Sequence, residues 1–263
     1  MPAALPAPVR TRIALLAFAA ALCATPACAA DPDKLWTIVH DECVPAEQDQ
    51  HHRVAPCAEV DLSGGVERGH VVLKDIVGNT QFLVIPTARV TGIEDPALLA
   101  AKAPNYWAPA WIARFYVFAR ARRQLPRSAI GLAVNSVEGR SQNQLHIHID
   151  CVQPDLRRYL LRHGARIRPR WADLGEAYNG HRYLAMRLDS RDLTGIEPFK
   201  LLAGGIPAAR QHMGNWTLAV VGMPSGFVLL AGHVNPATHD RGEAEELLDH
   251  SCVLAKAAPA KAM

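Results

Sequence analysis

Two histidines at alternating positions are the residues of this sequence best suited to chemistry. His146 and His148 lie in the segment Gln144–Val152, in which polar and apolar residues alternate. Because successive side chains of a strand face opposite sides, this alternation predicts a strand with both imidazoles on its polar face. A neutral imidazole keeps one bare ring nitrogen, and with a pKa near ~6.5 histidine is largely neutral at physiological pH. Such a ring can attack a phosphoanhydride.

A short polar loop precedes this strand. It follows the predicted strand Ile130–Val134 and contains Asn135, Gly139, Arg140 and Ser141. Glycine lets the backbone approach a ligand closely, and arginine and serine donate hydrogen bonds. The loop therefore predicts a phosphate site beside the histidines, in which Arg140 and the loop amides stabilise the charge that moves during transfer.

The His-x-His spacing alone leaves three interpretations open: nucleophilic catalysis, metal ligation and a structural pair. A metal site could also draw on His51 and His52, which lie in a polar loop between Cys43 and Cys57. The spacing of these four residues matches no familiar zinc pattern.

The elements expected to position the histidines mix helices with strands. The predicted helices are Lys34–Cys43, Asn105–Arg123, Pro154–Arg162, Pro198–Ala203 and Glu243–Lys256. The further predicted strands are His70–Ile76, Gln81–Pro86, Tyr183–Leu188, Trp216–Met223 and Phe227–Gly232. The longest predicted helix carries one aromatic stripe: Trp107, Trp111, Phe115 and Phe118. The pattern predicts an α+β fold.

Composition and charge restrict the function. The chain has 263 residues, of which 49% are hydrophobic and 20% charged, as in globular proteins. Arg10 and Arg12 are the only charged residues before Asp31, and without them 26 basic side chains face 25 acidic ones. This balance argues against a nucleic-acid partner held by general electrostatics.

Residues 1–30 have the features of an export segment. Arg10 and Arg12 precede the apolar run Ile13–Ala24, and Ala27–Ala30 are small residues suited to cleavage. The run is shorter than the ~20 residues of a spanning helix. A cleaved signal peptide and a retained signal anchor both remain open, and both place the globular part outside the cytoplasm.

Four cysteines follow this segment: Cys43, Cys57, Cys151 and Cys252. An even number in an exported chain favours two disulfides, for which three pairings exist. In one pairing, Cys43–Cys57 closes a polar loop and Cys151–Cys252 ties the histidine strand to the C-terminal helix. Four buried free thiols are the alternative.

The motifs resemble the histidine-triad (HIT) superfamily. Its Asn…Gly-x-Ser loop and alternating histidines match Asn135, Gly139, Ser141, Gln144, His146 and His148. A closer resemblance, to the CDP-diacylglycerol diphosphatase family, rests on Val71–Asp75, Gly139–Asn143, His146–Ile149 and His212–Gly214. It runs from about Leu35 to Leu254 and includes all four cysteines.

This resemblance implies a HIT-like antiparallel sheet with packed helices. Residues 31–255 would form the domain, with 35–163 the catalytic half, 164–255 a second half of related element order and 256–263 a tail. The implied activity is hydrolysis of CDP-diacylglycerol to CMP and phosphatidate through a cytidylyl-histidine, in phospholipid metabolism. The implied place is the periplasmic side of the bacterial inner membrane, at the membrane surface, with no metal or other cofactor.

The resemblance also assigns roles to individual residues. His146 would be the nucleophile, His148 would bind the non-bridging oxygens, and Ser141 would bond the bridging or leaving oxygen. Asn135 would position the loop and the phosphate, and Asp75 would accept hydrogen bonds from the ribose. The remaining members of the expected substrate-binding set are Gly139, Arg140, Gln142, Asn143 and Gln144.

The roles of Gln144 and His212 are not assigned by the motifs. Gln144 stands where the superfamily usually has its first histidine; it can form hydrogen bonds but cannot be charged. For His212 both a site role and a helix-capping role are open. The histidines outside any motif are expected at the surface: His51, His52, His163, His181, His233, His239 and His250.

Other functions remain as alternatives. A nucleotidyl transferase would pass the nucleotide from His146 to an acceptor other than water, and a nucleotide pyrophosphatase would act on other substrates. A periplasmic metal-binding protein would use His146 and His148 as ligands.

Overall fold

A computed structural model describes Met1 and residues 31–49 and 54–256. The predicted export segment, the His51–His52 pair and residues 257–263 of the predicted tail lie outside the described residues.

A ten-stranded antiparallel sheet forms the centre of the described part of the chain. Across the sheet, the strands are β1 (Cys57–Asp61), β2 (His70–Lys74), β3 (Phe82–Pro86), β5 (Ile147–Val152), β4 (Ile130–Val134), β8 (Trp216–Gly222), β9 (Phe227–His233), β7 (His181–Leu188) and β6 (Ala172–Tyr178). The short strand β10 (Leu248–Asp249) pairs with the end of β5. The predicted mixture of an antiparallel sheet and helices is confirmed.

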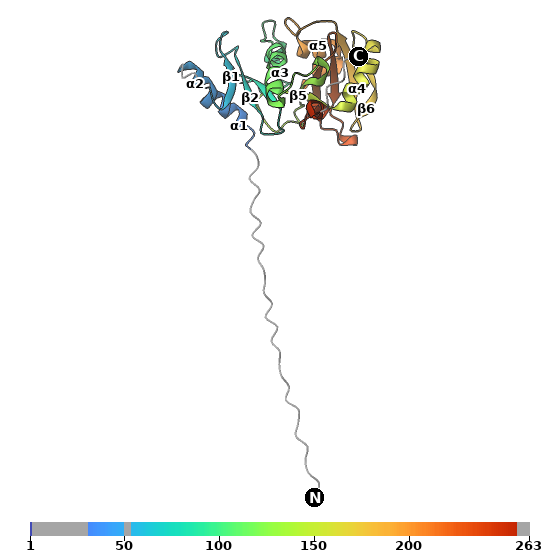
Figure 1. The fold of residues 1–263 in the computed structure, drawn as a ribbon, viewed down its shortest axis with the longest axis horizontal. Helices are drawn as coiled ribbons and strands as arrows, with labels where there is room; N and C mark the ends of the chain where they lie inside the picture. Colours follow the sequence, from blue (N-terminus) through green and yellow to red (C-terminus); the bar gives the residue numbers. More distant parts are fainter. Residues whose placement is uncertain (2–30, 50–53, 257–263) are drawn as a thin grey trace. The chain divides into compact units, whose positions relative to one another are not determined.

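Helices flank the sheet on both faces. They are α1 (Lys34–Thr37), η1 (Ile38–Cys43), α2 (Val44–Gln48), η2 (Pro96–Leu99), α3 (Trp107–Ala121), η3 (Arg127–Ala129), α4 (Pro154–His163), η4 (Gly164–Arg166), α5 (Pro198–Gly205), α6 (Pro207–Gln211), η5 (Met213–Asn215), η6 (Pro236–Thr238), η7 (Ala244–Leu247) and α7 (Val253–Lys256). Figure 1 shows α1 and α2 beside β1 and β2, and α4 beside β6 at the other end of the sheet.

The long helix α3 covers one face of the sheet. Trp107, Trp111 and Phe118 are buried in the same cluster as Ile147 and the other apolar residues of that face. Phe115 is 50% exposed, although the predicted stripe included it. At 3.6 residues per turn, two successive steps of four residues from Trp107 rotate Phe115 away from the sheet.

The histidines lie on the opposite face. Directly paired residues of neighbouring strands share a face, and His148 pairs with Leu83 and Ala133, which do not belong to the α3 cluster. At one end this face is covered by η1 and α2, which pack Val39 against Leu83. At the other end it is covered by α4 and by residues 240–252, which we call the C-terminal segment. The histidines lie between these two covers.

The predicted helix Glu243–Lys256 is wrong. Its residues form the single 3-10 turn η7, the strand β10 and the short helix α7. Leu248 and Asp249 pair with β5, and the Asp249 carboxylate accepts hydrogen bonds from the backbone N–H groups of Ser251 and Val253. Strand pairing and a local side-chain turn therefore replace the helix.

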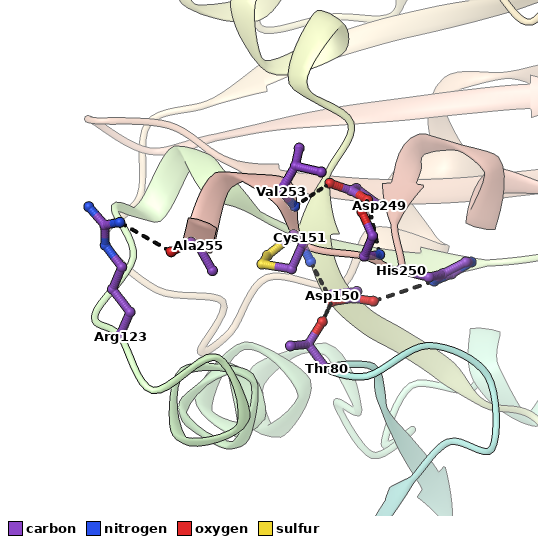
Figure 2. The surroundings of a disulfide bond; sticks show 10 residues. Thr80, Arg123, Asp150, Cys151, Asp249, His250, Val253 and Ala255 are labelled. Atoms are coloured by element: carbon purple, nitrogen blue, oxygen red, sulfur yellow. Dashed lines mark hydrogen bonds and ion pairs between the residues drawn. A yellow bond between two sulfur atoms is a disulfide. The ribbon is translucent and has the colours of Figure 1, made fainter. Parts of the chain in front are cut away.

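Both disulfides join the cysteines in one of the pairings considered from the sequence. Cys43–Cys57 links η1 to β1, and Cys151–Cys252 links β5 to the end of the C-terminal segment. The second bond closes a sequence separation of 101 residues (Figure 2). A crosslink over so long a loop restricts the unfolded chain strongly.

None of the described helices is both long and apolar enough to cross a membrane.

Candidate active site

A cavity of about 500 Å³ opens beside the histidine pair. It is lined by the N-terminal helices, Pro56 before β1, β2 with the turn after it, β3, the loop before β5, β5 itself and η7. The polar lining residues are Lys34, Lys74, Asp75, Ser141, Gln142, His146, His148 and Glu245. Its walls toward the N-terminal helices and β2 are apolar, formed by residues such as Leu35, Ile38 and Leu73.

The predicted strand Gln144–Val152 is shorter in the structure: β5 begins at Ile147, and His146 lies just before it. The backbone of this preceding segment holds His146 in one tautomer. Its Nδ1 lies 2.7 Å from the backbone oxygen of Gln144, and a carbonyl oxygen can only accept. Nδ1 therefore carries the hydrogen and Nε2 is the bare nitrogen. No hydrogen bond to Nε2 is formed by the described residues. The ring, only 8% exposed, lines the cavity.

The surroundings also keep His146 uncharged. Burial, and next the proximity of His148, lower the pKa of His146 from 6.5 to about 4, against the opposing effect of the Gln144 hydrogen bond. A neutral imidazole with a bare Nε2 is the nucleophilic form.

This pKa predicts the acid limit of activity. We expect kcat/KM to show no decline from protonation of His146 until the pH approaches 4, because the free ring takes up a proton only there. The pH dependence of kcat/KM between pH 4 and 8 measures this. A decline with a midpoint near 6.5 would show that the ring titrates as an exposed histidine does.

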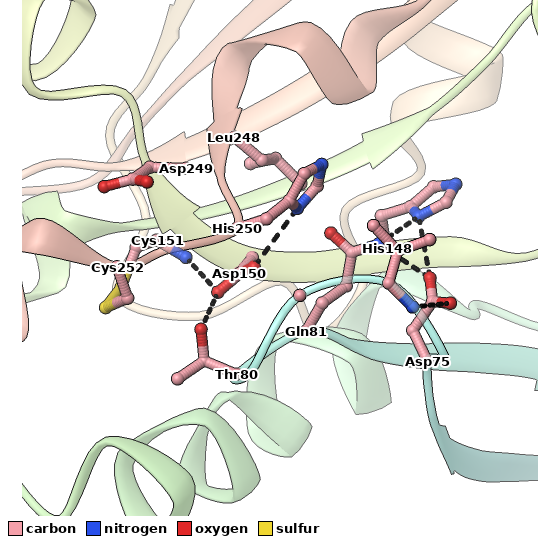
Figure 3. Close-up of polar contacts among 12 residues, drawn as sticks. Asp75, Thr80, Gln81, His148, Asp150, Cys151, Leu248, Asp249, His250 and Cys252 are labelled. Carbon is pink, nitrogen blue, oxygen red and sulfur yellow. Dashed lines mark hydrogen bonds and ion pairs between the residues drawn. A yellow bond between two sulfur atoms is a disulfide. The ribbon is translucent and has the colours of Figure 1, made fainter.

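His148 belongs to a polar cluster with Gln81 and Asp75 (Figure 3) and with Glu245. The Gln81 amide nitrogen lies 2.6 Å from Asp75 Oδ2 and 2.8 Å from Glu245 Oε1. Nδ1 of His148 lies 3.2 Å from the same nitrogen and 3.3 Å from Glu245 Oε1. All four side chains therefore converge on one point of the cavity wall.

The two ring nitrogens of His148 have different surroundings. The Gln81 amide has two hydrogens, and both carboxylates can only accept, so both hydrogens are used. Nδ1 of His148 lies 3.3 Å from Glu245 Oε1, an ion-pair distance, and Nε2 is left for other contacts. Nε2 is buried without a partner among the described residues. With a hydrogen on Nε2, the ring can donate to an oxygen of a bound phosphate.

Both carboxylates of the cluster are stabilised as anions. Burial acts to raise the pKa of Asp75, but hydrogen bonds from His148, Gln81 and the Val77 N–H outweigh it and lower that pKa. Burial opposes the shift at Glu245 too, and His148 contributes most to lowering its pKa. The cluster therefore remains charged over the physiological pH range.

The same atoms are close enough to share a cation. One oxygen each of Asp75 and Glu245 and one nitrogen of His148 lie within 4.8 Å of one another. The Gln81 amide nitrogen already donates to both carboxylates. We therefore interpret the group as a hydrogen-bonded cluster centred on that amide.

The loop before β5 brings only part of the predicted set to the cavity. Ser141 and Gln142 line it, and Gln142 also accepts a hydrogen bond from the Leu35 N–H at 2.9 Å. Asn135 does not line the cavity, but its side chain accepts from the Glu245 N–H at 3.0 Å. Its role is to hold η7 against the loop.

Arg140 is engaged elsewhere. Its guanidinium forms a two-pronged ion pair with Glu94, with distances of 2.6 and 2.7 Å. Gly92 makes room for it, since a Cβ there would lie 2.1 Å from Arg140 Nη1. The structure places this charge beneath the loop and not in the cavity lining.

The other predicted residues have scaffolding contacts. Gln144 is fully buried and donates to the backbone oxygens of Pro86 and Ala88. The Asn143 N–H donates to Pro32 O, and a Cβ at Gly139 would lie 2.8 Å from the Gly242 oxygen. None of the three lines the cavity.

His212 is exposed at the end of α6 and does not line the cavity. Gly214 of the same motif accepts a hydrogen bond from the Val137 N–H at 2.9 Å, in the loop after β4. The motif therefore supports the loop through its backbone.

Sequence reasoning missed Gln81, Glu245, His250 and Lys34 as functional candidates. His250 was expected at the surface, but its ring bridges Asp150 and Glu245. The one available signal was Cys252, because its pairing with Cys151 brings His250 next to the histidine strand. Glu245 had no motif at all.

A buried, neutral histidine with a bare ring nitrogen, beside donors suited to phosphate oxygens, defines the class: an enzyme site for attack on phosphorus. The family model of CDP-diacylglycerol pyrophosphatase matches residues 30–256. This chain belongs to that family. It is 42% identical over 224 residues to a curated CDP-diacylglycerol pyrophosphatase of Yersinia pestis, a match that covers 84% of each chain.

Proposed function

We propose that this protein hydrolyses the diphosphate bond of CDP-diacylglycerol and releases CMP and phosphatidate through a cytidylyl group on His146. Membership of the pyrophosphatase family supports the substrate and the bond. The single observation that carries the mechanism is the 2.7 Å contact between His146 Nδ1 and Gln144 O, which leaves Nε2 as the attacking atom.

In the first step Nε2 of His146 attacks the phosphorus that bears cytidine. A P–N bond forms, the P–O bond to the second phosphate breaks, and phosphatidate leaves with the bond's electron pair. Nδ1 keeps its proton throughout, and its hydrogen bond to Gln144 O strengthens as the ring becomes positive. This backbone oxygen thus stabilises the charge that the attack creates.

In the second step water attacks the same phosphorus. The P–N bond breaks, neutral His146 returns, and the water proton is lost to solvent or to the departing CMP. Hydrolysis therefore needs no net change in the protein.

Other lining residues have roles in binding. Nε2 of His148 contacts a non-bridging oxygen, and the Ser141 hydroxyl bonds the bridging or leaving oxygen. Lys34 lines the cavity without an ion-pair partner among the described residues and supplies positive charge where Arg140 does not. Asp75 accepts from the ribose with Oδ1, which also accepts from the Val77 N–H at 3.0 Å.

The test of this function is product analysis with the purified full-length chain. CDP-diacylglycerol in mixed detergent micelles should yield CMP and phosphatidate in equal amounts, with and without chelator. Added alcohols should not divert the cytidylyl group. Cytidylated alcohol as the main product would establish the transferase instead, and loss of turnover with chelator would establish a metal-dependent reaction.

We also propose that the sheet consists of two HIT-like halves. The strand order β2-β3-β5-β4 on one side of the centre is repeated as β6-β7-β9-β8 on the other. Helix α3 lies between β3 and β4 in the chain, as α5 and α6 lie between β7 and β8. On the second half the corresponding face is filled by apolar residues such as Ala219 and Leu230. Within the described residues, the catalytic site therefore belongs to the first half.

The expected location is the periplasmic side of the inner membrane, at the lipid surface. A basic patch supports this proposal: the exposed arginines Arg158, Arg162, Arg166, Arg168 and Arg170 on and after α4. Arginines near an anionic bilayer each contribute about 1 kcal/mol to binding.

Charge removal in this patch tests the surface. Replacing Arg162, Arg166 and Arg170 with glutamine is expected to lower binding to vesicles containing phosphatidylglycerol by about 100-fold. Co-sedimentation with vesicles measures it, and the exposed pair Arg191→Gln/Arg210→Gln serves as the control. Equal binding of both variants, or equal binding to pure phosphatidylcholine vesicles, would contradict the assignment.

A further inference from the structure

We propose that His250 is a positioning residue of the catalytic site: it fixes the carboxylate of Glu245 and, through it, the ring of His148. Asp150 and the Cys151–Cys252 disulfide hold His250 in place. The inference rests on the proposed function and adds to it a set of side chains delivered by the C-terminal segment.

The relay begins at a fully buried carboxylate. Asp150 has 0% exposure and follows His148 by two residues on β5, so both side chains point to the same face. Its Oδ1 accepts from the Thr80 hydroxyl at 2.6 Å and from the Cys151 N–H at 2.8 Å. Its Oδ2 lies 3.4 Å from Nδ1 of His250 and has that ring as its partner (Figure 3). A buried carboxylate needs such a partner, and His250 supplies it.

The second ring nitrogen of His250 faces Glu245, which lines the cavity. Nε2 lies 3.4 Å from Oε1 of Glu245, the oxygen that also accepts from Gln81 and faces Nδ1 of His148. Three nitrogens therefore converge on one carboxylate oxygen. Among the described residues, the other oxygen of Glu245 accepts one hydrogen bond, from the Asn135 amide at 3.3 Å. Without His250 this carboxylate would lose one of the contacts that fix its rotamer.

Covalent and packing constraints hold the ring of His250. The disulfide ties Cys252, two residues further along, to the strand that carries Asp150 (Figure 2). The turn between β2 and β3 packs against the backbone of His250. Asn79 N donates to His250 O, and a Cβ at Gly78 would lie 2.8 Å from the His250 Cβ.

This arrangement explains how a carboxylate 97 residues beyond His148 in the chain reaches the catalytic histidines. Glu245 lies 3.3 Å from Nδ1 of His148 and fixes the orientation of that ring, as an aspartate orients a catalytic histidine in hydrolase triads. His250 fixes the orienting group and does not itself line the cavity. Displacements of about 1 Å in such supporting groups can lower rates by about 100-fold.

Substitution of His250 tests the role directly. In His250→Gln the amide can reach either Asp150 or Glu245 but cannot bridge them. We expect kcat to fall about 10- to 100-fold with KM changed less than about threefold. The matched control is His233→Gln, at an exposed histidine on β9 whose ring meets that of Trp216 edge-on. It should leave kcat unchanged.

A double-mutant cycle then separates positioning from stability. Replacing Cys151 and Cys252 with alanine should lower kcat at temperatures where the thermal unfolding curve shows a folded protein. In the His250→Gln background, replacing the two cysteines should lower kcat by less than about threefold further, because both changes act through the ring of His250. If the cysteine variant does not fold, the kcat and KM of His250→Gln alone test the positioning role.

Wild-type release of CMP and phosphatidate establishes the proposed function separately from these variants. If wild-type turnover is present and His250→Gln keeps wild-type kcat, the positioning role is wrong. The positioning role is also wrong if the loss of kcat in the combined variant equals the product of the two separate losses. Independent losses would show that the disulfide does not act through this ring.

Discussion

Replacing His146 with alanine or asparagine is expected to abolish turnover, with kcat lower by about 10⁴-fold or more. The ring of His146 lies in the cavity lining and combines a bare nitrogen, a tautomer fixed by a backbone oxygen and a pKa of about 4. Asparagine can still donate to the Gln144 oxygen, so this variant should keep the local hydrogen bond and the fold. Release of CMP, with thermal unfolding as the check of folding, measures the effect.

Ser141→Ala is the comparison for this variant. Ser141 lines the cavity but forms no side-chain hydrogen bond within the described residues. Loss of one donor to a developing charge costs about 10²-fold, so the serine variant should be slowed far less than the histidine variant. Equal losses in the two variants, or a His146→Asn enzyme with substantial activity, would contradict the assignment of the nucleophile.

Gln81→Glu is expected to have the second-largest effect. The change removes the amide that donates to Asp75 and Glu245 and places a third carboxylate between them. Leaving buried charges unpaired costs about 3–5 kcal/mol. At pH 8 we expect the free energy of unfolding to fall by about that amount and kcat to fall by about 100-fold or more. Chemical denaturation and turnover measure the two effects.

The sign of the pH dependence follows from the same cluster. Asp75 and Glu245 should raise the pKa of the introduced carboxyl group above its value in the unfolded chain, so the penalty is present at high pH. It should shrink as the pH falls through the raised pKa, because the protonated carboxyl is neutral and can donate to one neighbour. Activity relative to the wild type should therefore rise from pH 8 to pH 5. An exposed control, Gln211→Glu on α6, should show no such trend. A constant ratio of Gln81→Glu activity to wild-type activity between pH 8 and pH 5 would show that the Gln81 amide does not hold the carboxylates of Asp75 and Glu245.

The local part of the site could be predicted from the sequence because neighbouring residues determine it, although β5 begins only at Ile147. Alternation over Gln144–Val152 places His146 and His148 on one face, and both lie there. Glycine and serine in the loop correctly indicated a close approach, and Ser141 reaches the cavity. Arg140 was assigned to phosphate by residue type alone. Its partner Glu94 lies 46 residues earlier, where no local pattern could indicate the ion pair.

The long-range part of the site could not be predicted in this way. Gln81 and Glu245 are 164 residues apart and meet through the antiparallel pairing of the sheet and the course of the C-terminal segment. The apolar spacing of Leu247, Leu248 and Val253 favoured a helix there. The pairing of Leu248 with β5 and the Asp249 turn determine the actual course.

Trapping the reaction intermediate tests the central claim most directly. Substrate labelled at the phosphorus next to cytidine should be mixed with enzyme, quenched with denaturant at alkaline pH within one turnover, and digested for peptide mapping. We predict an acid-labile, alkali-stable label on the peptide that contains residues 144–152, with cytidylyl on His146. A label on His148, on a carboxylate or on any other residue would contradict the proposed nucleophile.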